Sequence, residues 1–208
     1  GISAIDQAVE TLYASGYMHN HNRMYVAAMA CNFGKSHWKI PAKWMYYYLL
    51  DADWASNALS WQWVAGANSN KKYIANQENI NKYTYTKDSE TFLDKSYEEL
   101  LEFDDIKDLQ NLTEPVLTTK LPDKTDVSLT EHKDIAIYNL YNLDPKWKQE
   151  LDLDRILLLE PSVFADYPVS EKTINFVLDL SKNIEGIQVF VGEFSELQAC
   201  APSANFYF

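Results

Sequence analysis

The spacing of apolar residues changes along the chain, and this change constrains the fold more than any other feature. Up to about residue 83, apolar residues recur every three or four positions between stop signals such as Gly16 and Gly66, which is typical of helices. The pattern predicts helices near residues 3–15, 19–33, 41–50 and 54–65. Ser3 and Asp53 are expected to cap the first and last of them. The first part of the chain should therefore be mainly α-helical.

The last part of the chain has continuous apolar runs instead. Residues 155–160 (RILLLE) and 187–192 (IQVFVG) indicate buried parallel strands, with a further strand near 134–141 and a helix over 170–182. A strand, a helix and another strand in this order predict a right-handed crossover and a small α/β unit. We expect a helical domain over 1–83, a connecting excursion over 84–130 and the α/β unit over 131–208.

Composition argues against several classes of protein. The longest apolar run, from Met24 to Cys31, has eight residues, whereas a membrane span needs about 20. No basic segment leads into an apolar stretch near residue 1, so no signal peptide is expected. Two cysteines and four scattered histidines predict neither a disulfide framework nor a metal site. We expect a cytoplasmic protein without a membrane span or a bound metal.

The net charge of −12 is unevenly distributed. Residues 1–85 carry seven Lys/Arg and five Asp/Glu, whereas residues 86–208 carry eleven and twenty-five. The acidity therefore belongs to the second part and does not exclude an anionic ligand in the first. Five of the six tryptophans also lie in the first part, between Trp38 and Trp63. This clustering is unusual and sets the first part of the chain apart.

Two polar clusters in the first part could carry chemistry. Arg23, at the end of the sequence HNHNR, is the first of only two arginines, and its planar guanidinium suits a carboxylate, a phosphate or a ring edge. A surface helix with an incidental arginine is the simpler alternative. Asp51 and Asp53 precede Asn57, which would lie one helical turn after Asp53. Such residues can do acid–base work or hold a cation, but helix capping is the simpler and slightly favoured explanation for the aspartates.

Trp61 and Trp63 form a third cluster, in the sequence SWQW. Residues two apart point to different sides of a helix, so one core cannot bury both side chains in the same way. Their presence favours stacking on a flat ligand or a redox role. An ordinary aromatic core is the alternative.

Taken together, three blocks identify a family resemblance. GYMHNHNRM (16–24), LLDADWASN (49–57) and SWQW (60–63) resemble the FAD-binding helical domain of the photolyase/cryptochrome family, without gaps between the blocks, over about residues 1–83. The resemblance implies FAD as the cofactor, with Asn20 as a catalytic and cofactor-binding residue at the reactive edge of the flavin ring. Arg23 and Asp51 would form a buried ion pair beside that ring. Asp53 and Asn57 would complete the cofactor contacts.

The resemblance also implies roles in electron transfer and in substrate binding. Trp61 matches the tryptophan nearest the flavin in the family's electron-transfer chain, and Trp38 matches the middle one. Met24 and Trp63 match positions that line the pocket for a flipped-out pyrimidine dimer. His21 matches a position where an arginine often contacts a DNA phosphate.

The implied function is that of a deoxyribodipyrimidine photolyase, a carbon–carbon lyase that uses FAD and blue light to repair cyclobutane pyrimidine dimers in damaged DNA. The branch that repairs 6–4 lesions has histidines at the positions of Asn20 and Met24, so the cyclobutane branch matches better. Two alternatives stay open. The protein could be a blue-light sensor without repair activity, or a non-catalytic fragment, since the family's phosphate-binding segment, active-site glutamate and outermost tryptophan would precede residue 1. The oligomeric state is not predicted.

Overall fold

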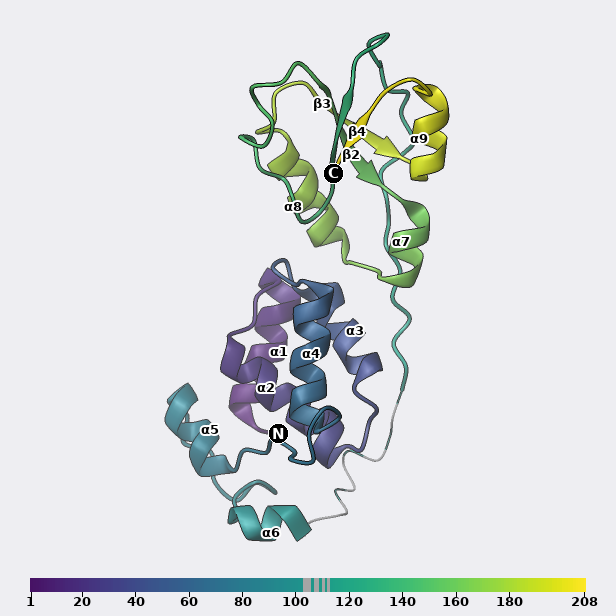
Figure 1. Ribbon diagram of the computed structural model, residues 1–208. Helices are drawn as coiled ribbons and strands as arrows, with labels where there is room; N and C mark the ends of the chain where they lie inside the picture. Colours follow the sequence, from purple (N-terminus) through teal and green to yellow (C-terminus); the bar gives the residue numbers. More distant parts are fainter. Residues whose placement is uncertain (103–105, 107–108, 110, 112) are drawn as a thin grey trace. The chain divides into compact units, whose positions relative to one another are not determined.

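The computed structural model describes residues 1–102, 106, 109, 111 and 113–208 (Figure 1). These residues form a helical unit over 1–116 and an α/β unit over 117–208, which confirms the expected fold class. The unit boundary differs from the expected division at residues 83 and 130. Part of the expected connecting segment, at 103–105, 107–108, 110 and 112, lies outside the described residues.

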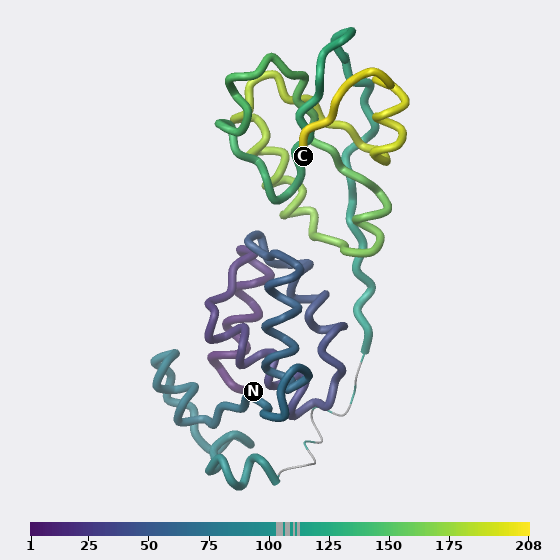
Figure 2. Tube along the Cα trace, in the orientation of Figure 1, coloured from purple at the N-terminus to yellow at the C-terminus, as the bar shows by residue number. Residues whose placement is uncertain are grey.

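The first unit is built around the helices α1 (Ser3–Ser15), α2 (Asn20–Ala28), α3 (Lys39–Tyr48) and α4 (Trp54–Ala65). Helix α2 contacts α1 and α4, and α4 contacts α3, so the four lie together as a bundle (Figure 2). Their apolar stripes meet in one core that contains Leu12, Met45 and Trp61. Gly16 and Gly66 end α1 and α4 in the left-handed conformation, at φ 74° and 70°, as their positions predict.

The predicted helix over 19–33 is split into two kinds of helix. Its last turn is a π-helix, η1 (Met29–Phe33), in which the amide of Gly34 donates to the Met29 carbonyl at 2.8 Å. A π-turn holds more residues than an α-turn and changes which side chains face the core. Asn32 lies in this turn and is buried.

The expected connecting excursion starts as part of the helical unit. It contains α6 (Tyr97–Glu102), which follows α5 (Gln77–Thr84). Leu93, Leu100 and Ile106 are buried in one core with Tyr25 of α2. These apolar contacts hold the segment against the bundle, because each removes apolar surface from water.

The expected capping role of Ser3 is wrong. The N-cap of α1 is Ile2, which makes no side-chain capping bond, whereas the amide and hydroxyl of Ser3 donate to the Asp88 carboxylate at 2.8 and 2.7 Å. A carboxylate close to a helix N-terminus also interacts favourably with the helix dipole. The helix start is therefore stabilised by a residue 85 positions along the chain, which local sequence does not reveal.

The second unit is a parallel four-stranded sheet in the order β3-β2-β1-β4. Its strands are β1 (Ile135–Tyr138), β2 (Asp154–Leu159), β3 (Ile187–Val191) and β4 (Phe206–Tyr207). Helix α8 (Glu171–Ser181) lies in the connection between the neighbouring parallel strands β2 and β3, which confirms the predicted strand–helix–strand unit. The sequence did not predict β4, α7 (Pro161–Asp166) or α9 (Phe194–Cys200).

The two faces of this sheet are covered by different helices. Leu197 of α9 is buried with Ile137 and Ile156, and α8 lies on the opposite side of the strands (Figure 1). The chain crosses the sheet in one direction from β2 to β3, through α8, and in the opposite direction from β3 to β4, through α9. Right-handed connections in opposite directions place their helices on opposite faces. Within the part of the chain that the structure describes, no helix combines the length and apolar character that crossing a membrane requires.

Candidate functional site

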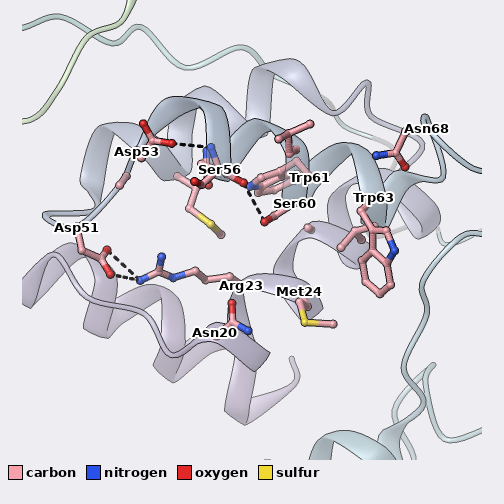
Figure 3. Close-up of a pocket in the computed structure, with 16 residues that line it drawn as sticks. Asn20, Arg23, Met24, Asp51, Asp53, Ser56, Ser60, Trp61, Trp63 and Asn68 are labelled. Atoms are coloured by element: carbon pink, nitrogen blue, oxygen red, sulfur yellow. Dashed lines mark hydrogen bonds and ion pairs between the residues drawn. The ribbon is translucent and has the colours of Figure 1, made fainter. Parts of the chain in front are cut away.

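A cleft of about 610 Å³ opens between α2 and α4 in the helical unit (Figure 3). This volume lies within the range of about 300–1,000 Å³ that is usual for ligand pockets. The cleft brings together the predicted site residues Asn20, Arg23, Met24, Asp51, Asp53, Asn57, Trp61 and Trp63. They come from α2, from α4 and from the turn that precedes α4, so the sequence blocks that suggested a site do converge in space.

Arg23 and Asp51 form the ion pair at one end of the cleft (Figure 3). One terminal nitrogen of Arg23 donates to both carboxylate oxygens of Asp51, at 3.0 and 2.9 Å. The Nε of Arg23 donates to the Met18 carbonyl at 2.7 Å, which fixes the plane of the guanidinium. The pairing is as the resemblance implies, but the Asp51 side chain is 57% exposed. The pair is therefore open to solvent instead of buried.

Asp53 and Asn57 are positioned by the start of α4. Asp53 is the N-cap, and its Oδ1 accepts from the amide of Ser56 at 2.7 Å. This hydrogen bond lowers the pKa of Asp53 from its usual value, because it stabilises the charged form. Asn57 donates its side-chain amide to the Ala42 carbonyl at 2.8 Å and so ties α4 to α3. Both side chains already have structural partners at the cleft.

The two tryptophans of the SWQW block differ in burial, as their spacing predicts. Trp61 is 2% exposed and belongs to the core of the helical unit, whereas Trp63 is 49% exposed. Both line the cleft, so a ligand there would meet a buried indole and an accessible one. Met24 lines the same cavity from α2 and lies near Trp63 in Figure 3.

Two predicted site residues do not line the cleft. His21 is exposed and stacks between the rings of His19 and Tyr83, at centroid distances of 5.4 and 5.2 Å. Trp38 precedes α3 and packs, partly buried, against the same core as Trp61. The roles of these two residues stay predictions.

Several cleft residues were missed by sequence reasoning. Ser56, Leu59, Ser60 and Asn68 all line the cavity. Helical spacing from Asp53 could have found Ser56 and Ser60, since positions three and four apart share a face. Asn68 follows the end of α4 in a polar loop, where periodicity carries no information.

The comparison with known protein families decides what this cleft belongs to. Residues 1–125 match the FAD binding domain of DNA photolyase. The chain belongs to the photolyase/cryptochrome family. The match extends beyond the sequence blocks, which end at residue 63, and beyond residue 83, where the resemblance was expected to end. It covers the segment whose residues Leu93, Leu100 and Ile106 complete the helical core.

Individual relatives of this family member include photolyases and cryptochromes. The chain is 42% identical over 67 residues to a deoxyribodipyrimidine photo-lyase of Agrobacterium fabrum, covering 32% of this chain and 14% of the relative. It is 36% identical over 67 residues to cryptochrome-2 of Arabidopsis thaliana, covering 32% and 11%. A photo-lyase of Streptomyces griseus is 35% identical over 72 residues, covering 35% and 16%. The alignments thus span about a sixth or less of each relative. No solved structure matches the chain.

The cleft of this photolyase-family chain fits the flavin part of FAD. Asn20 and the paired Arg23 supply amide and guanidinium donors on one side. Met24, Met45 and Val64 supply apolar surface. A flavin ring combines a flat apolar body with polar atoms along one edge, so this donor set suits it. Among the described residues, no group of three His, Cys, Asp or Glu side chains is arranged to hold a metal.

The cap at Asp53 leads to a first expectation about stability. Because the folded-state pKa of Asp53 is lowered, its contribution is present above the ordinary carboxyl pKa and is lost as the pH falls through the lowered value. Asp53→Ala is expected to lower Tm by a few degrees at pH 7 and by less at pH 3. Asp53→Asn keeps a capping oxygen, so its Tm should fall only slightly. Thermal unfolding followed by circular dichroism measures both effects; a pH-independent loss in Asp53→Ala would contradict the assignment.

Proposed function

We propose that this chain carries the flavin-binding and lesion-binding cleft of a photolyase that reverses cyclobutane pyrimidine dimers in damaged DNA under blue light. The observation that carries the proposal is the cleft itself, with the Arg23–Asp51 pair at one end and the half-exposed Trp63 at the other (Figure 3). The location in the cytoplasm and the absence of a metal stay predictions from composition.

The residues at the Arg23 end would bind and tune the cofactor. The chemistry that FAD would supply here, once reduced, is the loan of one electron to the lesion, which returns to the flavin after the two bonds of the dimer have broken. Arg23 would stabilise negative charge on the reduced ring, and Asp51 would keep the guanidinium oriented. Asn20, on the first turn of α2, would hydrogen-bond the polar edge of the ring.

The residues at the other end would bind the lesion. Trp63 offers about half of its surface, and Met24 supplies a flexible apolar contact beside it. A dimer flipped out of the duplex exposes two bases that need such apolar and stacking surfaces. Leu59, which lies four residues before Trp63 on the same face of α4 and is largely exposed, extends this surface.

DNA binding by the whole chain tests the proposal. We expect at least tenfold tighter binding of a short single strand with one thymine dimer than of the undamaged strand, measured by fluorescence anisotropy. Trp63→Ala should weaken dimer binding about tenfold, since stacking on an aromatic side chain contributes about 1–3 kcal/mol per base. Leu101→Ala, which removes another exposed apolar side chain of this unit outside the cleft, is the matched control and should change nothing.

The same assay separates repair from sensing. A repair enzyme loaded with FAD should restore the undamaged strand under blue light, and its DNA affinity should fall as salt rises because phosphate contacts release counterions. A protein that binds FAD but shows no preference for the dimer and no repair would contradict the proposal. That result would favour a blue-light sensor, in line with the similarity to cryptochrome-2.

A further inference from the structure

Asn32 is a buried polar residue in the π-helix η1 and does not line the cleft. The residue is buried, with 6% of its surface exposed. Its side-chain nitrogen donates to the carbonyl of Val64 at 2.9 Å and to the carbonyl of Tyr73 at 2.6 Å. Its side-chain oxygen, Oδ1, is the one buried side-chain polar atom without a partner among the described residues.

The two carbonyls fix the orientation of this amide. A carbonyl only accepts hydrogen bonds, so the NH₂ group of Asn32 must face both of them and Oδ1 must point away. Leaving a buried acceptor without a partner is unfavourable, and native proteins contain few such groups. An apolar side chain would avoid this cost. The advantage of asparagine at this position is therefore its ability to hold two backbone carbonyls together.

The two carbonyls flank the loop that borders the cleft. Val64 is on the last turn of α4, and its carbonyl also accepts from the amide of Tyr73 at 3.0 Å, which closes the loop between them. The ring of Tyr73 lies 5.5 Å from the ring of Trp63. Trp63, Val64 and Asn68 of this segment line the cleft. Asn32 thus holds both ends of the segment 64–73, which forms one wall of the cleft together with Trp63.

We propose that Asn32 is a positioning residue, which holds Trp63 and the loop with Asn68 in place through the carbonyls of Val64 and Tyr73. The inference about the cleft wall stands on these contacts alone. Its consequence for DNA rests on the proposed function, in which Trp63 meets the lesion.

The position of Trp63 can be measured without any ligand. In protein labelled with 5-fluorotryptophan, the ¹⁹F NMR signal of Trp63 is assigned by its loss in Trp63→Phe. Asn32→Leu is expected to shift or broaden this signal, while the signal of Trp147 in the α/β unit stays unchanged. An unshifted, equally sharp Trp63 signal in folded Asn32→Leu protein would overturn the proposal.

A matched control separates positioning from general stability. Gln77 is also a buried amide of the helical unit, at 1% exposure, and is bonded to Asn81 and Thr91 away from the cleft. Gln77→Leu should lower Tm but leave the Trp63 signal unchanged. If Asn32→Leu does not fold, Asn32→Ser serves instead, because its hydroxyl can donate to one carbonyl. Asn32→Ser should then change the Trp63 signal by an intermediate amount. A Trp63 signal that stays unchanged in this variant would contradict the proposal.

A binding assay distinguishes this inference from the proposed function. Asn32→Leu should weaken binding of dimer-containing DNA about fivefold and FAD binding by a smaller factor, because the polar contacts at the Arg23 end of the cleft are untouched. A moved Trp63 signal with unchanged dimer binding, in a protein whose Trp63→Ala variant also binds normally, would contradict the proposed function and leave the positioning role intact.

Discussion

Replacing Arg23 with lysine is expected to weaken FAD binding at least tenfold. The guanidinium donates hydrogen bonds from two of its nitrogens: Nε donates to the Met18 carbonyl, and a terminal nitrogen donates to Asp51. A lysine ammonium is a single point donor on a flexible stem and cannot make both contacts in one plane. A hydrogen bond to a charged group typically contributes about 1.5–3 kcal/mol, and the exposure of Asp51 places this effect at the lower end.

Titration of FAD, followed by flavin fluorescence and by the visible absorption that survives desalting, measures this loss. Arg155→Lys is the matched control, since Arg155 in the α/β unit is also bonded to backbone carbonyls, those of Leu153 and Lys148 among them. It should bind FAD like the unaltered chain. If Arg23→Lys binds FAD as tightly as the unaltered chain does, Arg23 does not contribute to the cofactor site. If the unaltered chain binds no FAD, the result would instead support the alternative that the chain is a non-catalytic fragment.

The sequence predicted those parts of the site that depend on local signals. Asp53 caps α4 and Gly66 ends it, as their residue types and positions indicate. Two indoles two residues apart on this helix have different burial, which follows from helical geometry alone. The pairing of Arg23 with Asp51, 28 residues away, is predicted only from the family resemblance, because no periodic pattern connects a helix with a distant turn.

Features that depend on tertiary contacts could not be predicted in this way. The π-turn that contains the buried Asn32 cannot be predicted from a pattern with the α-helical period. Asp88 meets the start of α1 only after the chain has folded back, and β4 has two residues, too few for a strand signal. Short apolar stretches such as the one around Leu93 resemble a loop until their partners in the core are known.

Replacing Trp61 with phenylalanine is expected to slow the light-driven reduction of bound flavin at least tenfold. Trp61 lines the cleft and is almost fully buried, so with FAD bound in the cleft its indole would give one electron to the light-excited flavin. A phenyl ring is much harder to oxidise, although it keeps most of the apolar contact. Trp38 packs against the same core and would then donate an electron to the oxidised Trp61. Trp38→Phe should therefore also slow flavin reduction, by a smaller factor.

The rate is measured from the loss of visible flavin absorption under blue light, with a thiol as the final electron donor. Trp44→Phe is the matched control, because Trp44 also packs partly buried against this core but does not line the cleft. All three variants should bind FAD within threefold of the unaltered chain, which separates electron transfer from cofactor binding. If Trp44→Phe slows reduction as much as Trp61→Phe, the electron does not enter through Trp61. A slower reduction in Trp61→Phe but not in Trp44→Phe would show that the electron reaches the flavin through the buried indole that borders the cleft.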